Sequence, residues 1–156
     1  GWRLGYCGAP KEIIAAMNKI QSQSTTSTSS ITMAAAVEAI NGPQDFIIDH
    51  NNKFLKRRDL VVNKLNAIQG IKCAKPEGAF YVYPNCEGIL GKITPSGKKL
   101  SNDEDFMTYL LEDQGVAGVH GSAFGLSPYF RLSYAASDDI LEDACNRIQL
   151  ACSKLK

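Results

Sequence analysis

The sequence is poor in the side chains that most often hold metal ions. It has only two histidines, His50 and His120, and its five cysteines include no C-x-x-C pair. Zinc sites need closely spaced cysteines and histidines, and disulfide frameworks use even numbers of cysteines in short secreted chains. The composition therefore argues against a metal centre and against a disulfide framework. Free thiols favour a reducing compartment, most simply the cytosol.

The sequence also lacks an excess of charge and a long apolar run. Lys and Arg number 17 against 16 for Asp and Glu, and the basic residues are spread along the chain. Nucleic-acid-binding proteins carry clustered basic residues, and a membrane-spanning helix needs about 18 or more consecutive apolar residues. The sequence predicts neither kind of partner, which leaves small molecules or another protein.

What the sequence does contain is a helical first half. Its 156 residues, 44% hydrophobic, suffice for one ordinary core and part of a second. Pro10 occupies a typical first helical position, and apolar residues follow it at helical spacing. Ser29 or Ser30 is positioned to cap a second helix over 31–41, and the periodic run over 43–70 predicts one long helix.

The second half predicts a small sheet with helices. Residues 71–76 and 78–85 are expected to form two antiparallel strands around a turn, because they are rich in aromatic and β-branched residues. Ser101 and Glu104 form a capping box for a helix ending at Gly115. The remaining expected elements are strands within 116–121 and 129–135 and a last amphipathic helix that begins near Ser137.

Arg131 is the first candidate for chemistry. Alternation along "YFRLSYA" puts it on the opposite face of a strand from Phe130 and Leu132. An arginine in so apolar a strand needs an anionic partner, because an unpaired buried guanidinium is costly. That partner is either an acidic residue of the same domain or the carboxylate of a substrate, gripped by two hydrogen bonds. Arg3 poses the same choice near a helix start, where a phosphate could bind.

Four segments together carry a family signature. They are "GWRLGY" (1–6), "PEGAFYVYP" (76–84), "GVAGVHGSAFG" (115–125) and "FRLSYA" (130–135). In this order and approximate spacing they resemble class I aminotransferases, most of all the bacterial-type aspartate aminotransferases. The similarity extends over nearly the whole chain.

The resemblance implies an α/β fold, of which this chain is an α+β fragment. The family has fold-type I of the pyridoxal-phosphate enzymes. Residues 1–45 would be the end of the large cofactor domain. Residues 46–156 would be a connecting helix and the small C-terminal domain, a small β-sheet covered by helices.

The resemblance also implies roles for individual residues. Arg3 matches the arginine that contacts the phosphate of pyridoxal phosphate, and Arg131 matches the one that binds the substrate α-carboxylate. Gly78 and Phe80 belong to a small-domain turn that approaches the site, although a purely structural role suits them equally. His120 is assigned no catalysis.

In the family, the lysine that holds the cofactor as a Schiff base lies shortly before the Gly-Trp-Arg run. None of the lysines of this sequence lies in a matching motif. The resemblance therefore implies a cytoplasmic, homodimeric parent enzyme that transfers amino groups between amino acids and 2-oxo acids, with the isolated chain inactive. Aspartate is the expected substrate, and prephenate, aromatic and broader dicarboxylate activities stay open. The alternative is a non-catalytic folded domain or truncation product with only an association role.

Overall fold

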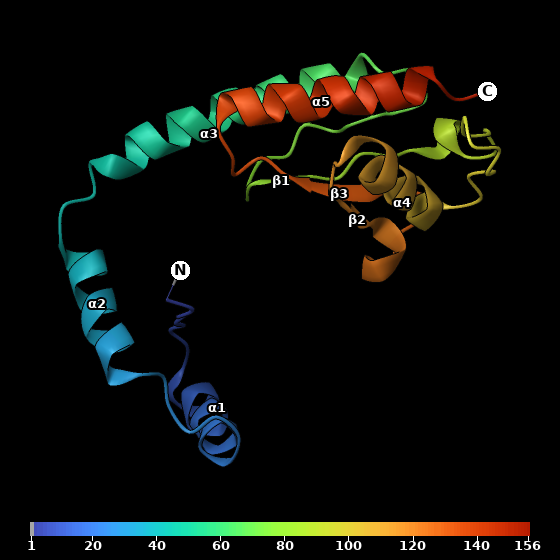
Figure 1. Cartoon of the computed structure of the whole chain (residues 1–156). Helices are drawn as coiled ribbons and strands as arrows, with labels where there is room; N and C mark the ends of the chain where they lie inside the picture. Colours follow the sequence, from blue (N-terminus) through green and yellow to red (C-terminus); the bar gives the residue numbers. More distant parts are fainter. Residues whose placement is uncertain (1) are drawn as a thin grey trace. The chain divides into compact units, whose positions relative to one another are not determined.

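The computed structural model describes residues 2–156 and divides the chain into two compact units, Gly1–Ile47 and Ile48–Lys156. The first unit contains the helices α1 (Lys11–Gln23) and α2 (Ser30–Asn41), drawn in blue in Figure 1. Both helices were expected, although Pro10 precedes the first helical residue of α1 rather than occupying it. No residue of α1 is buried. Ser29 is the N-cap of α2, but its side chain makes no capping hydrogen bond.

Helix α3 (Phe46–Asn66) is shorter than the predicted run over 43–70. Its end has a local cause in the side chain of Asn66. The amide nitrogen of Asn66 donates to the carbonyl of Cys73 at 2.9 Å, and its oxygen accepts from the N–H of Cys73 at 2.8 Å. These two hydrogen bonds to the backbone of Cys73 turn residues 67–73 back along α3, so the helix does not continue.

Strand pairing in the second unit differs from the prediction. Residues 71–76 and 78–85 meet only at an isolated antiparallel bridge between Lys72 and Asn85. The strand β1 (Tyr81–Val82) pairs with β3 (Phe130–Ser133) instead. The predicted hairpin is therefore wrong. The pairing of β1 with β3 continues beyond both strands, where the N–H of Tyr134 donates to the carbonyl of Phe80 at 2.8 Å.

The sheet has three antiparallel strands in the order β1-β3-β2, where β2 is Val119–His120. Val119 lies opposite Arg131, and Tyr81 lies opposite Ser133. A short 3-10 helix, η2 (Gly121–Phe124), follows β2, and another, η1 (Glu87–Ile89), follows the segment after β1. The mixed α+β architecture expected for this part of the chain is confirmed.

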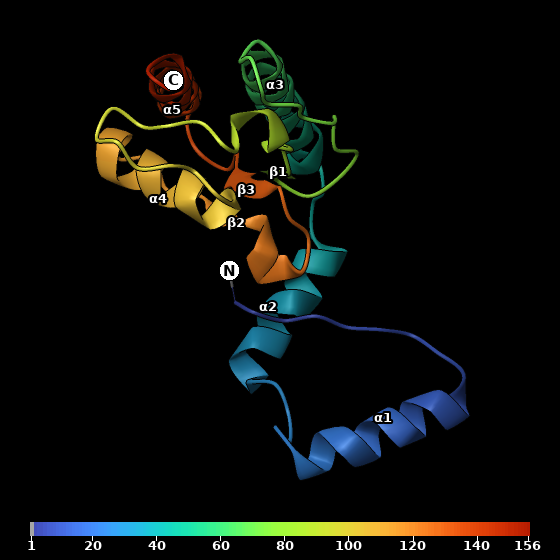
Figure 2. The ribbon, with the colours of Figure 1, turned by 90° about the vertical axis from the view of Figure 1, so that its right-hand side faces the viewer.

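Helices cover the sheet. Figures 1 and 2 show α3 and α5 (Asp138–Ser153) side by side over the sheet, and ion pairs join them from Arg57 to Asp138 and from Lys64 to Glu142, each at 2.9 Å. Helix α4 (Asp103–Gln114) contacts both α5 and β2. The second unit is thus a small sheet covered by three helices.

The start of α4 is capped one residue later than predicted. The side-chain oxygen of Asn102 accepts from the N–H of Asp105 at 2.8 Å, and the carboxylate of Asp105 accepts from the N–H of Ser101 at 2.9 Å. The expected capping box of Ser101 and Glu104 is therefore wrong by one position. The end of α4 at Gly115 is confirmed, since Gly115 has φ 65°, a conformation that favours glycine.

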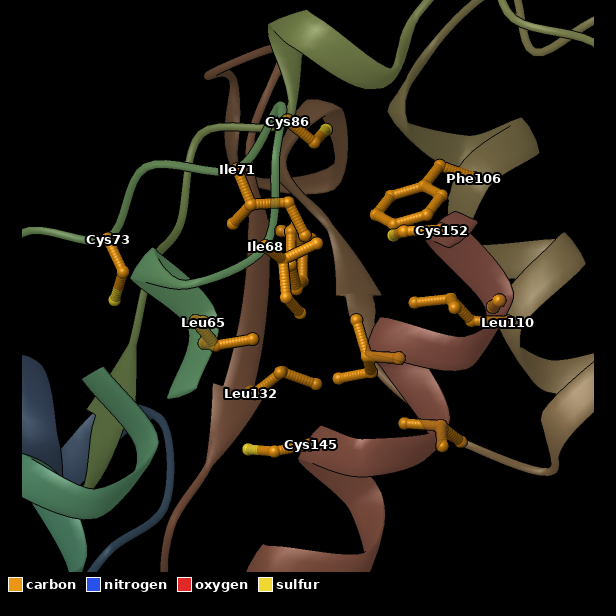
Figure 3. Packing of buried hydrophobic residues seen from close by; sticks show 14 of the residues in the cluster. Leu65, Ile68, Ile71, Cys73, Cys86, Phe106, Leu110, Leu132, Cys145 and Cys152 are labelled. Carbon is orange, nitrogen blue, oxygen red and sulfur yellow. The ribbon is translucent and has the colours of Figure 1, made fainter. Parts of the chain in front are cut away.

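One hydrophobic core holds the second unit together. In Figure 3, Leu65 of α3, Leu132 of β3 and Phe106 of α4 point into the same space. The rings of Phe106 and Phe130 meet edge to face with centroids 5.5 Å apart. Four of the five cysteines are buried among these apolar side chains. Among the described residues, none of the helices has the length and apolarity needed to cross a membrane.

Candidate functional site

Arg131 lies in the middle strand of the sheet, as its sequence context predicts. Its neighbours Phe130 and Leu132 are buried in the core, while Arg131 is half-buried on the other face. Alternation along β3 therefore separates the core from the face that bears Arg131. The core residues fix the backbone of β3, and that backbone fixes where the guanidinium stands.

Two aromatic rings hold the guanidinium of Arg131. Its central carbon lies 4.5 Å from the centroid of the Tyr81 ring and 4.6 Å from that of Phe124. Such cation–π contacts orient a guanidinium without using its N–H donors. Within residues 2–156, no carboxylate pairs with Arg131 and no group accepts a hydrogen bond from it. The structure therefore gives no support to the internal ion pair, and the planar donor set is available to an external anion.

The loop that supplies Phe124 is itself packed by tyrosines. Tyr83 stacks on Tyr129 with centroids 5.5 Å apart, and its hydroxyl donates to the carbonyl of Gly121 at 3.2 Å. Burial is the main cause of a raised pKa at Tyr83, and the nearby Asp103 raises it further. Tyr83 therefore keeps its proton and remains a hydrogen-bond donor to the loop.

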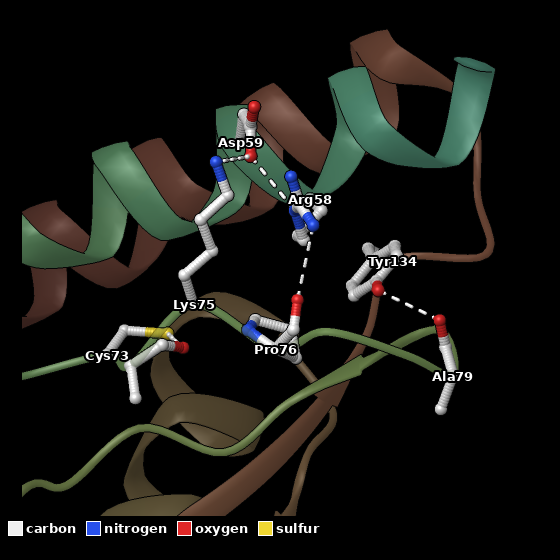
Figure 4. A network of polar contacts seen from close by, with 8 residues as sticks. Arg58, Asp59, Cys73, Lys75, Pro76, Ala79 and Tyr134 are labelled. Carbon is white, nitrogen blue, oxygen red and sulfur yellow. Dashed lines mark hydrogen bonds and ion pairs between the residues drawn. The ribbon is translucent and has the colours of Figure 1, made fainter. Parts of the chain in front are cut away.

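The turn that contains Gly78 and Phe80 is clamped at two points (Figure 4). The hydroxyl of Tyr134 donates to the carbonyl of Ala79 at 2.9 Å, and Arg58 of α3 donates to the carbonyl of Pro76 at 3.3 Å. The residue with positive φ in this turn is Ala79, at 59°, and not Gly78. A side chain at Gly78 would meet no atom within 4 Å.

The two turn residues have different surroundings. Phe80 contacts Tyr81 with ring centroids 4.5 Å apart, so one ring connects it to the guanidinium of Arg131. Gly78 lines a hollow of about 340 Å³ together with Phe54, Arg58 and Tyr134, and Arg131 does not line that hollow. Of the predicted site residues in the second unit, Phe80 is thus connected to Arg131 through the ring of Tyr81, whereas Gly78 lines a different hollow.

Arg3 belongs to the first unit. It is exposed and has φ 57°, which is unusual for a residue with a side chain. Together with Trp2 it lines a hollow of about 590 Å³ against α2, whose residues there are small. No acidic side chain pairs with Arg3 in the part of the chain that the structure describes. Its guanidinium has room and free donors for a phosphate, so it fits that group of pyridoxal phosphate.

Several contributors to the site were not predicted from the sequence. Tyr81, Phe124 and Tyr134 come from three separate segments, and only the fold brings them around Arg131 and the 76–80 turn. The one available signal was their position within the family motifs. His120 bonds Ser122 at 2.6 Å, and residues 2–156 contain no group of three metal-binding side chains.

The comparisons with known proteins agree with this arrangement. The family described as aminotransferase class I and II matches residues 1–148. The chain is 58% identical over 155 residues to the aspartate aminotransferase of Rhizobium meliloti (strain 1021), covering 99% of this chain and 38% of that protein. It is 57% identical over 156 residues to the probable aspartate/prephenate aminotransferase of Rhizobium leguminosarum bv. phaseoli, covering 100% and 39%.

Solved structures give the same result. The aspartate aminotransferase from Rhizobium meliloti matches with a TM-score of 0.93 and 58% identity, covering 100% of this chain and 39% of that one. An aromatic aminotransferase from Pyrococcus horikoshii matches with a TM-score of 0.79 and 32% identity, covering 98% and 39%.

The fold and the comparisons thus identify the class of protein as the aminotransferases. Within that class, the chain belongs to the family of class I and II aminotransferases. It spans 38–39% of the length of the curated relatives described above.

Proposed function

We propose that this chain forms part of an aminotransferase subunit that moves an amino group between aspartate and a 2-oxo acid. The observation that carries the proposal is the guanidinium of Arg131, held between two rings with no carboxylate partner within residues 2–156. All amino acids and 2-oxo acids share an α-carboxylate. A fixed guanidinium that binds this group serves both half-reactions of an amino transfer.

Arg131 would bind both oxygens of the α-carboxylate through its planar set of donors. Its two aromatic neighbours would orient it and keep water from one side of the bound carboxylate. Phe80 would extend this apolar wall through its contact with Tyr81. Gly78 would contribute at most through the backbone of its turn.

Arg3 would hold the phosphate of pyridoxal phosphate. When bound, that cofactor supplies an electron sink that makes the α-proton of an amino acid removable. The task of this chain would then be to bind and align. Arg3 would anchor the cofactor at its phosphate, and Arg131 would fix the substrate at its α-carboxylate so that the bond to the α-proton has a defined direction.

The division of the chain into two units supports the assignment of residues 1–45 to a large cofactor domain and of residues 46–156 to a connecting helix and a small domain. Homodimer formation in the cytoplasm is part of the proposal. The first unit exposes apolar side chains of the kind that interfaces cover, including Trp2, Tyr6 and Ile20. Aspartate is proposed as the substrate because two of the relatives carry it in their names.

The test compares the complete subunit that contains this chain with the isolated 156-residue chain. With pyridoxal phosphate, aspartate and 2-oxoglutarate, the complete subunit should form oxaloacetate and glutamate. The isolated chain should form neither, because none of its lysines lies in the cofactor-binding motif. Prephenate and phenylalanine are assayed in parallel to resolve the substrate. Absence of amino transfer with every pair would overturn the proposal.

A further inference from the structure

Asp103 is a buried carboxylate outside the residues discussed so far. It is the first residue of α4, and only 1% of its surface is exposed. One oxygen, Oδ2, accepts from the backbone N–H of Ser122 at 2.9 Å. The other, Oδ1, is buried without a partner at hydrogen-bond distance among the described residues. No lysine or arginine pairs with Asp103 in residues 2–156.

Burial removes the hydration of this carboxylate, which by itself costs stability. Helix capping does not account for it, because Asn102 already caps α4 and Asp105 accepts from Ser101. Burial raises the pKa of Asp103, but the hydrogen bond from the N–H of Ser122 and the nearby hydroxyl of Ser127 outweigh it, and the pKa is lowered. Asp103 therefore remains a charged acceptor at neutral pH.

Through Ser122, Asp103 is hydrogen-bonded to the loop that follows β2. Within that loop, the N–H of Leu126 donates to the carbonyl of Gly121 at 3.0 Å, and the N–H of Gly125 donates to that of Ser122 at 3.1 Å. A Cβ on Gly121 would clash with the backbone oxygen of Leu126, so the turn closes too tightly for any side chain there. The loop is compact, and Asp103 bonds it from the helix side.

This loop carries one of the two rings that hold Arg131. Phe124 lies two residues after Ser122, and its ring centroid is 4.6 Å from the guanidinium carbon. The hydroxyl of Ser122 is also bonded, to Nδ1 of His120 at 2.6 Å. Of these two hydrogen bonds of Ser122, the one to Asp103 has the buried, charged acceptor. A short series of contacts therefore connects Asp103 of α4, through Ser122 and Phe124, to Arg131.

We propose that Asp103 is a positioning residue for carboxylate binding: its carboxylate fixes the 121–126 loop and thereby sets Phe124 against the guanidinium of Arg131. The inference rests on the proposed function, because it assigns Asp103 a role in the site where Arg131 would bind the substrate. It adds a residue that neither touches the substrate nor lies in the strand that bears Arg131.

The test uses the complete subunit with three variants. Asp103→Ala removes the acceptor, and Asp103→Asn keeps one oxygen that can accept from Ser122. Asp105→Ala is the matched control, because Asp105 is a carboxylate on the same helical turn that pairs with Lys98 and bonds Ser101 instead of the loop. The measurements are the dissociation constant of succinate, which binds without reacting, the KM for aspartate and for 2-oxoglutarate, kcat, and the unfolding temperature.

Asp103→Ala should weaken succinate binding by about tenfold, the size expected when a hydrogen bond to a charged group is lost, and should raise both KM values. Asp103→Asn should recover part of the loss. Asp105→Ala should lower the unfolding temperature and leave the succinate constant unchanged. If the Asp103 variants lose thermal stability as Asp105→Ala does and still bind succinate normally, the role is only structural and the proposal is overturned. If Asp103→Ala does not fold, Asp103→Asn decides by the same criteria.

A second readout needs no turnover. The rings of Tyr81 and Phe124 should shift the NMR signals of the Arg131 side-chain protons, and displacement of Phe124 in Asp103→Ala should move those signals toward their ordinary positions. Unchanged signals would overturn the positioning role even in an inactive subunit. A wild-type subunit without amino transfer would overturn the proposed function alone.

Discussion

Single residues obtain their roles here from neighbours that are distant in sequence. Arg131 is oriented by Tyr81, 50 positions earlier, and by Phe124 from the preceding loop. Ala79 adopts positive φ in a turn whose carbonyl is bonded by Tyr134. Such a conformation is unfavourable for a residue with a side chain and persists only where the surroundings fix it. The hydroxyl of Tyr134 contributes directly, because it donates to the carbonyl of Ala79 itself.

Tyr134→Phe tests this clamp. The variant loses one buried hydrogen bond and should lower the free energy of unfolding by about 1 kcal/mol, measured by urea denaturation. Tyr109→Phe is the matched control, because its buried hydroxyl donates to the carbonyl of Ala151, far from the turn. Both variants should lose stability, but only Tyr134→Phe should accelerate amide exchange at residues 77–80. Equal exchange in the two variants would show that the turn does not depend on Tyr134.

The elements were predictable where their causes are local. Pro10, the Ser29–Ser30 pair, Gly115 and Ser137 all mark helix ends that the structure has within one residue. The strand pairing was not predictable, because β1 joins a strand 50 residues away and the sequence offers no local sign of that choice. The end of α3 was also missed, since it depends on Asn66 bonding the backbone of Cys73.

The site was predictable to a similar extent. Alternation along β3 correctly placed Arg131 on the face opposite Phe130 and Leu132, and the family motifs supplied its expected role, which stays a prediction. The sequence could not show which rings would contact the guanidinium or that an internal ion pair would be missing within residues 2–156. Those facts depend on packing between segments. Gly78 was named for a turn whose special conformation is in fact at Ala79.

The start of α4 gives a test at the scale of one element. Asn102→Ala should lower the free energy of unfolding by about 1 kcal/mol, because the N–H of Asp105 loses its side-chain acceptor. Ser101→Ala and Glu104→Ala are the controls, and each should change stability by less than about 0.5 kcal/mol. Urea denaturation of the three variants distinguishes the two possible caps. A larger loss in Ser101→Ala than in Asn102→Ala would restore the capping box predicted from the sequence.

At the scale of the whole molecule, the two units differ in how they are held. The first unit buries few side chains, whereas the second encloses the hydrophobic core in which four cysteines lie. Burial raises the pKa of Cys73 and Cys145 to about 11 and that of Cys86 and Cys152 to about 12. These thiols are therefore packing residues that stay protonated, and only Cys7 is exposed.

Thiol chemistry tests this distribution. At neutral pH, iodoacetamide should label one cysteine, Cys7, per folded chain and all five after unfolding in urea. The raised pKa values also make the free energy of unfolding depend on pH. The contribution of the buried thiols to stability is complete below the unfolded-state pKa of 9.0 and is lost as the pH rises toward 11 to 12. Rapid labelling of more than one thiol in the folded chain would show that the core is open.

The most direct test of the central claim is the kinetics of Arg131→Lys in the complete subunit. Lysine keeps the charge but cannot bond both carboxylate oxygens in one plane, so kcat/KM should fall. The fall should correspond to about 1 to 3 kcal/mol of lost transition-state stabilisation. The loss should be equal for aspartate and for a monocarboxylic amino acid, since both have an α-carboxylate. Arg147→Lys, on the surface beside Asp143, should leave the kinetics unchanged. If Arg131→Lys instead lowers the unfolding temperature and leaves kcat/KM intact, Arg131 is a structural residue and the account is contradicted.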